Sequence, residues 1–173
     1  TTLNGSVCPT DGTDEVLSAH FLVGREKYKG ATYVEDNTQN QSWLQISYTR
    51  RDHFKIAPSL SLGTYLQLYY STRRLSKTYQ ATMMQAGAFT PTLTSLFNYD
   101  PKFRANQYIA GGITPIIKLN SFIQIRPAFY AFVPYRTILE NKDGTASYSK
   151  KRLSSFEYIA DITAAVRLSN ISV

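Results

Sequence analysis

The feature that most constrains this sequence is a set of long segments in which apolar side chains occupy every second position. Four of them are the longest: Ser59–Tyr70, Ala105–Leu119, Phe122–Tyr135 and Phe156–Leu168. Successive side chains of a β-strand point to opposite faces of the sheet, so this period of two predicts strands with one apolar face. In the last segment the opposite face is largely polar. The chain is therefore expected to be all-β.

Shorter stretches of the same pattern extend the prediction to about seven or eight strands. They lie near Val16–Val23, Ser42–Arg51 and Thr78–Phe89. With 13 tyrosines and 9 phenylalanines, the chain is rich in residues that favour strands, whereas stretches rich in alanine, leucine and glutamate are nearly absent. We expect residues 1–15 to be a polar leader or linker, and residues 16–173 to form one antiparallel up-and-down meander.

The predicted connections differ in length on the two sides of this meander. Tight turns are expected at Leu119–Ser121 and Leu168–Asn170, with a short connection at Arg73–Lys77 on the same side. The opposite side is expected to carry the loops Asp52–Ala57, Pro91–Phe103 and Arg136–Lys151. Short turns on one side and long loops on the other are typical of outer-membrane barrels. Gly24–Asn40 conflicts with this scheme, because it is long and falls on the short side; an extra strand near Tyr28–Val34 would remove the conflict.

Strand length bears on the class of barrel. Strands in globular proteins average about 5–6 residues, whereas strands that cross a bilayer need roughly 9–11. The four long segments are long enough to cross a bilayer. Strands of this length also occur in soluble barrels such as lipocalins. In a membrane barrel the apolar face points outward and the polar face lines the lumen. We therefore favour a transmembrane-type β-barrel and predict that five polar side chains face its lumen: Gln124, Arg126, Glu157, Asp161 and Arg167.

Motifs for catalysis or metal binding are missing from the sequence. There is no Gly-x-Ser-x-Gly elbow, and neither His20 nor His53 has a partner at His-x-x-His or Glu-x-x-His spacing. Cys8 is the only cysteine, which rules out an internal disulfide, and its polar surroundings favour an inert thiol. Glu157 and Asp161 are interpreted as lumen groups rather than as a catalytic pair. We predict no catalytic residue, no metal site and no cofactor.

Charge indicates the kind of partner. The formal net charge of +7 suits a polyanion or an anionic lipid surface. Basic residues recur near the predicted strand ends at Arg50–Arg51, Arg73–Arg74 and Lys150–Arg152, where cations can anchor a barrel among anionic headgroups. No RNP-like motif or zinc-finger spacing accompanies them. Membrane lipid, and not nucleic acid, is the expected partner.

The stretch Gly87–Ile138 has a more specific likeness. It reads GAFTPTLTSLFNYDPKFRANQYIAGGITPIIKLNSFIQIRPAFYAFVPYRTI. This stretch resembles the C-terminal region of bacterial patatin-like phospholipases that carry a surface-antigen (BamA-type) outer-membrane β-barrel. The residues that carry the resemblance are Phe89, Pro91, Phe97, the run Phe103–Gly112, Pro115 and the run Ala128–Ile138. The family's catalytic motifs, Gly-x-Ser-x-Gly and Asp-Gly-Gly/Ala, are absent from this chain, so no catalytic role is carried over.

The resemblance implies a parent protein of the bacterial outer membrane with a signal peptide and a patatin-like acyl hydrolase domain outside this chain. Residues 1–15 contain no apolar secretory segment, and the chain starts without Met and ends within a predicted strand. We accordingly expect a barrel segment truncated at both ends, whose open strand edges favour self-association.

The first functional hypothesis is a barrel segment that anchors or presents this lipid acyl hydrolase at the membrane. Two alternatives stay open. One is a soluble small β-barrel that binds an apolar ligand or a glycan. The other is a stand-alone eight-stranded outer-membrane adhesin or structural barrel, without an enzyme attached.

Overall fold

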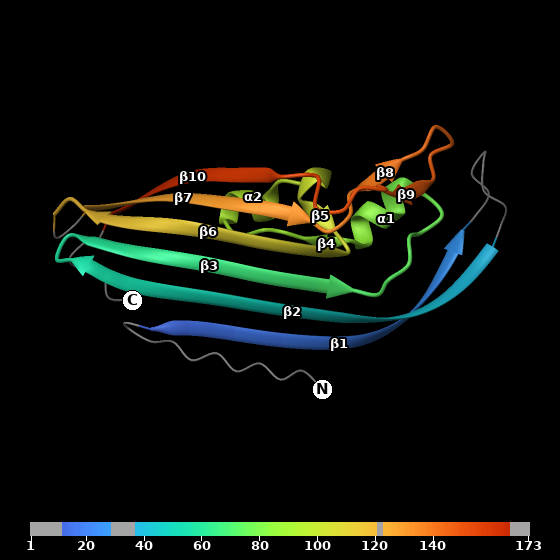
Figure 1. The fold of residues 1–173 in the computed structure, drawn as a ribbon, viewed down its shortest axis with the longest axis horizontal. Coiled ribbons are helices and arrows are strands. Elements are labelled where there is room, and N and C mark those ends of the chain that lie inside the picture. The colour runs from blue at the N-terminus through green and yellow to red at the C-terminus, as the bar shows by residue number, and fades with distance from the viewer. Residues whose placement is uncertain (1–11, 29–36, 121–122, 167–173) are drawn as a thin grey trace.

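The computed structural model describes residues 12–28, 37–120 and 123–166, and these form a mostly-β structure with one large antiparallel sheet (Figure 1). The sheet has six strands in the order β1-β2-β3-β6-β7-β10. Their bounds are Thr13–Tyr28 for β1, Asn37–Ala57 for β2, Leu60–Ser71 for β3, Gln107–Lys118 for β6, Ile123–Pro134 for β7 and Glu157–Val166 for β10. Each of these strands pairs antiparallel with the next, so the predicted up-and-down meander is confirmed.

The described strands form an open sheet with six long members rather than the seven or eight expected. β1 and β10 are its two edges, and no pairing joins them. The strands are long: β10 has 10 residues and β2 has 21. At a rise of about 3.3 Å per residue, even β10 extends roughly 30 Å. β1 begins at Thr13, so residues 13–15 of the predicted leader already pair with β2.

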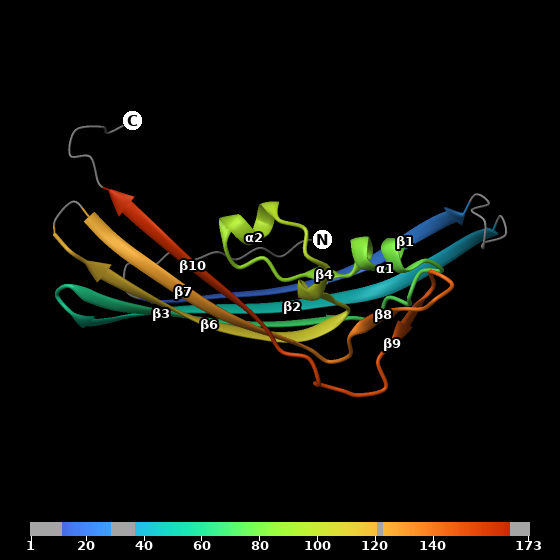
Figure 2. The ribbon, with the colours of Figure 1, turned by 90° about the horizontal axis from the view of Figure 1, so that it is seen from above.

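Two long connections carry all of the other elements. Between β3 and β6 lie α1 (Tyr79–Gln85), β4 (Gly87–Ala88), α2 (Leu93–Phe97), the 3-10 helix η1 (Pro101–Phe103) and β5 (Arg104–Ala105). Between β7 and β10 lies a small hairpin of β8 (Ile138–Glu140) and β9 (Ala146–Tyr148). Both connections leave the same end of the sheet, which we call the long-connection end (Figures 1 and 2).

The structure corrects three local predictions. Thr78–Phe89 is not a long strand: the Thr78 hydroxyl accepts a hydrogen bond from the backbone nitrogen of Ala81 at 3.3 Å, which caps α1. The good helix formers Ala81, Met83, Met84 and Gln85 then outweigh the weak alternation. Arg73–Lys77 is therefore the start of a long connection, not a short turn. Asp52–Ala57 is the end of β2, not a loop.

These corrections remove the conflict over Gly24–Asn40. The tight turn at the far end of β2 is Pro58–Ser59, so the connection from β1 to β2 falls on the long-connection end. β1 continues to Tyr28, whereas residues 29–36, the rest of the suggested extra strand, lie outside the described residues. β6 ends at Lys118 and β7 begins at Ile123, so these two strands are joined at the same end as Pro58–Ser59, and the predicted turn Leu119–Ser121 lies partly outside the described residues. The predicted turn at Leu168–Asn170 also lies outside the described part of the chain.

The β3–β6 connection packs onto one face of the sheet. Figure 2 shows a curved sheet with α1, α2 and β4 on its concave side. Phe89, just after β4, is 1 % exposed and stacks on Phe132 of β7, with ring centroids 5.6 Å apart. Tyr108 of β6 completes this contact at 4.9 Å from Phe132. The main core is therefore an aromatic cluster on the concave face, between the sheet and its own connection.

Candidate functional site

The opposite face of the sheet is a broad apolar surface without a covering layer among the described residues. The strand register aligns its side chains in rows, and one row runs Leu17, Tyr48, Leu68, Ile109, Val133 across five strands. We call this surface the apolar face. Its large side chains that are exposed to solvent are Leu17, Phe21, Val23, Leu44, Phe54, Leu66, Leu68, Tyr70, Ile109, Ile113, Ile117, Ile123, Phe129, Tyr158 and Ile162.

The apolar face exposes more large apolar side chains to solvent than the surface of a soluble monomer usually does. Phe21, Val23 and Ile162 are each more than 70 % exposed. Soluble monomers rarely expose a continuous apolar patch larger than roughly 300–600 Å². On this face, large exposed apolar side chains occur on all six strands of the sheet. The face therefore has the properties of a surface that contacts lipid or a partner.

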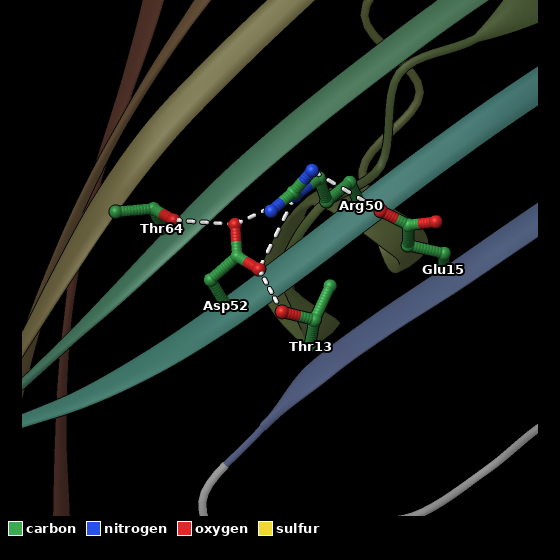
Figure 3. A network of polar contacts seen from close by, with 5 residues as sticks. All are labelled: Thr13, Glu15, Arg50, Asp52 and Thr64. Atoms are coloured by element: carbon green, nitrogen blue, oxygen red, sulfur yellow. Dashed lines mark hydrogen bonds and ion pairs between the residues drawn. The ribbon is translucent and has the colours of Figure 1, made fainter.

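One polar cluster interrupts the apolar face beside edge strand β1 (Figure 3). Arg50 lies between two carboxylates: its Nε is 2.9 Å from Asp52 Oδ2, and its Nη1 is 3.2 Å from Glu15 Oε1. The hydroxyls of Thr13 and Thr64 donate to Asp52 at 2.6 and 3.5 Å. The five residues come from β1, β2 and β3; both carboxylates pair with the one guanidinium, so the cluster keeps a net charge of −1. The sequence pattern does not indicate this cluster, because it predicts a strand end at Arg50 and a loop from Asp52.

The concave face holds four of the five residues predicted to face a lumen. The register aligns Glu157 with Phe132, Asp161 with Ala128, and Thr163 with Arg126, so these side chains share the face that carries the aromatic core. Gln124 shares it too, and its Oε1 accepts a hydrogen bond from Arg126 Nη2 at 3.2 Å. Among the described residues no ion pair joins Arg126 to Glu157 or Asp161. Arg167, the fifth residue, lies outside the described residues.

A cavity of about 330 Å³ lies between the β3–β6 connection and β10. Asp161 lines it, and its Oδ2 accepts a hydrogen bond from the Thr94 hydroxyl at 3.3 Å. Arg104 also lines it, but its Nη1 is already bonded to the backbone oxygens of Met83, Met84 and Ala86. Ser95 bonds back to Thr92 as part of the α2 capping box. The cavity thus has room for water or a small ligand; the Thr92 and Ser95 hydroxyls are used in capping, and the Thr94 hydroxyl is bonded to Asp161.

The two histidines do not form a metal site within the described part of the chain. His20 lies on β1 and His53 on β2, both exposed, and no group of three or more histidine, cysteine, aspartate or glutamate side chains is close enough there to hold a metal ion. Cys8 lies outside the described residues. None of the helices in that part is long and apolar enough to cross a membrane.

Comparison with protein-family models, curated proteins and solved structures gives no match for this chain. The resemblance to patatin-like phospholipase barrels therefore stays a prediction from the sequence.

Proposed function

We propose that this chain forms part of the wall of a bacterial outer-membrane β-barrel, with the apolar face toward lipid and the concave face toward the lumen. The observation that carries the proposal is the contrast between the two faces. Large exposed apolar side chains cover one face, whereas the β3–β6 connection, the aromatic core and the predicted lumen residues lie on the other. In a membrane barrel the outward face is apolar and the interior is polar or plugged by a loop.

The long-connection end of the apolar face supports this orientation. Tyr70 lies there, and Tyr135 continues from β7 with its backbone nitrogen 2.8 Å from the oxygen of Gln107, the cross-strand partner of Tyr70. Aromatic side chains of this kind form girdles at the two membrane interfaces of a barrel. The tight turns Pro58–Ser59 and 119–122 would then face the periplasm, with the long connections outside.

The soluble barrel is the less favoured alternative. It would need the apolar face to point inward, and the sheet would have to curve the other way around it. The concave side instead carries Phe89, Tyr108 and Phe132, which are at most 3 % exposed. A soluble barrel built on the apolar face would leave this aromatic core and its covering connection outside the barrel.

The Glu15–Arg50–Asp52 cluster is the part of the apolar face that fits lipid least. Its internal pairing removes much of the charge from contact with the surroundings, which lowers the cost of placing it at a membrane. Because it lies beside β1, it is also close to an edge where a barrel wall has to continue by pairing with another strand or another copy. We assign the lipid-facing role to the rest of the face.

We further propose, from the resemblance of Gly87–Ile138, that this wall anchors or presents a patatin-like lipid acyl hydrolase carried elsewhere in the parent protein. The proposal assigns the acyl hydrolase chemistry to residues outside this chain, because the family's catalytic motifs are absent from its sequence. A search for activity with this chain alone is therefore expected to give none.

Liposome flotation tests the membrane proposal. The chain is refolded from urea in the presence of vesicles of phosphatidylethanolamine and phosphatidylglycerol, and the floating fraction is examined by circular dichroism. We expect the protein to float with the vesicles and to give a strong β signal that withstands a carbonate wash. A soluble monomer that melts cooperatively and stays at the bottom of the gradient would contradict the proposal.

A further inference from the structure

A cleft rich in arginine opens at the long-connection end of the sheet. Its volume is about 400 Å³, and three of its ten lining residues are Arg73, Arg74 and Arg136. None of the ten carries a carboxylate. Three positive charges around one cleft without a counter-charge in its wall make an environment that favours an anion.

The cleft has a defined wall. Asn106 Nδ2 donates to the Tyr148 hydroxyl at 2.7 Å and to the backbone oxygen of Arg73 at 3.2 Å, which ties the end of β3, the start of β6 and β9 together. The guanidinium of Arg73 lies 4.0 Å from the centre of the Trp43 ring, so its position is fixed by stacking. Elements from three parts of the chain therefore build the wall of the cleft, and the Arg73 side chain is held in place before any ligand arrives.

Arg136 has an unused hydrogen-bond donor in this wall. Its Nε is buried and has no hydrogen-bond partner among the residues that the structure describes. A buried donor without an acceptor is unfavourable, which leaves Arg136 a hydrogen-bonding capacity that the described residues do not use. A phosphate oxygen is the acceptor that best matches a guanidinium.

An apolar groove continues directly from the cleft onto the apolar face. Its volume is about 550 Å³, and it shares Tyr70, Gln107 and Tyr135 with the cleft. The rest of its lining consists mainly of Ile46, Tyr48, Leu68, Tyr69, Tyr108, Ile109 and Leu153. The two hollows thus form one elongated site, cationic at the long-connection end and apolar along the strands.

We propose that this site binds one anionic phospholipid, with its phosphate in the arginine cleft and an acyl chain in the groove. The order of the two parts matches the proposed orientation of the wall, because the cleft falls at the membrane interface and the groove lies against the hydrocarbon. The inference rests on the proposed function, since it needs the apolar face to contact lipid. It adds the class of lipid recognised and the residues that recognise it.

Binding is tested with the chain folded in maltoside micelles, to which short-chain phosphatidylglycerol is added. Native mass spectrometry counts the retained lipid, and a titration gives the dissociation constant. We expect one retained lipid, and a loss of roughly tenfold or more in affinity for Arg136→Gln and for Arg74→Gln, because each removes a charge-assisted contact to phosphate. Arg126→Gln is the matched control, since it removes the same charge from the concave face and should bind like the wild type.

Two further arms identify the part of the lipid that is recognised. Short-chain phosphatidylcholine should bind more weakly than phosphatidylglycerol, and inorganic phosphate should displace the lipid only at much higher concentration. Ile109→Asn should weaken lipid binding while the circular dichroism spectrum is kept. Equal binding by all three arginine variants, or equal affinity for both lipids, would overturn the proposal. If equimolar phosphate displaces the lipid and Ile109→Asn has no effect on binding, the cleft binds phosphate alone. That result would overturn the proposal that an acyl chain lies in the groove.

Liposome flotation separates this inference from the proposed function. If Arg136→Gln still floats with vesicles but the wild type shows no preference for phosphatidylglycerol, only the lipid site is wrong. If the wild type does not float, the membrane wall itself is wrong and the lipid site loses its basis.

Discussion

The ring of Tyr130 lies across the backbone of Gly112, its cross-strand partner on β6. A Cβ atom at Gly112 would overlap that ring and would come 2.7 Å from the backbone oxygen of Phe129. The adjacent Gly111 is different, since a Cβ there would lie 3.5 Å from the backbone oxygen of Tyr65, an ordinary contact. Of these two neighbouring glycines, only Gly112 is required by the packing of the concave face.

Gly112→Ala is therefore expected to destabilise the fold, because Tyr130 has to leave its place over β6. Overpacking of this kind typically lowers the free energy of unfolding by about 1–3 kcal/mol. Gly111→Ala is the matched control and is expected to have a small effect. Urea unfolding followed by circular dichroism in micelles measures both. Equal midpoints for the two variants would contradict the assigned role of Gly112.

Phe89 should be the residue that holds the β3–β6 connection on the concave face. Its ring contacts Phe132, Tyr108, Tyr65 and Tyr130, and truncating a buried phenylalanine typically costs about 3–5 kcal/mol. We expect Phe89→Ala to lower stability by an amount in this range and to open the connection to trypsin at Lys102 and Arg104.

Phe97→Ala is the control for that experiment, because Phe97 lies in the same connection but is 82 % exposed. It should change neither the unfolding midpoint nor the rate of tryptic cleavage. If Phe97→Ala accelerates cleavage as much as Phe89→Ala does, the connection is not held by the aromatic core.

The charges of Glu15, Arg50 and Asp52 should affect insertion of the chain into vesicles together rather than one by one. Arg50→Met leaves Glu15 and Asp52 as uncompensated carboxylates on a face that is otherwise apolar, and the charge of an unpaired group is costly to bring to a membrane. The variant should therefore float less with vesicles than the wild type. The triple variant Glu15→Gln, Arg50→Met, Asp52→Asn removes the charges together and should float as well as the wild type or better. A triple variant as defective as the single one would show that the pairing of charges is irrelevant.

Asp143 provides a test of local structure in the β8–β9 turn. The hydroxyl and the backbone N–H of Thr145 donate to its Oδ1 at 2.7 and 3.1 Å and hold the pKa of this carboxyl below its ordinary value of 3.8. Because the folded-state pKa is lowered, the carboxylate form stabilises the turn above the unfolded pKa, and this contribution is lost as the pH falls through the folded pKa. NMR titration should show a lowered pKa in the wild type and a value closer to 3.8 in Thr145→Val. An ordinary pKa in the wild type would contradict the turn.

The long strands could be predicted because their alternation is strong and extends over ten residues or more. Ser59–Tyr70 and Phe122–Tyr135 differ from β3 and β7 by one residue at each end, since the period of two decides both the strand and its faces. For the same reason Gln124, Arg126, Glu157 and Asp161 were placed together on one face from the sequence alone.

The connections could not be predicted in the same way. Thr78–Phe89 has a weak alternation that a short capped helix overrides, and the contact of Phe89 with Phe132 joins residues far apart in the sequence. The arginine cleft also depends on long-range contacts, because Arg73, Asn106 and Arg136 come from three separate segments. The Arg50 cluster had one local signal, an Arg-x-Asp spacing that places Arg50 and Asp52 on the same face of a strand.

The most direct test of the account is to ask which face of β10 contacts hydrocarbon. Ile162 and Thr163 are adjacent and both exposed, but Ile162 lies on the apolar face and Thr163 on the concave face. In a Trp43→Phe background, which removes the only tryptophan, a single tryptophan is placed at either position, and the chain is inserted into vesicles with brominated acyl chains. We predict strong fluorescence quenching for Ile162→Trp and little for Thr163→Trp. Equal quenching at both positions, or stronger quenching at Thr163→Trp, would contradict a barrel wall with its apolar face toward lipid.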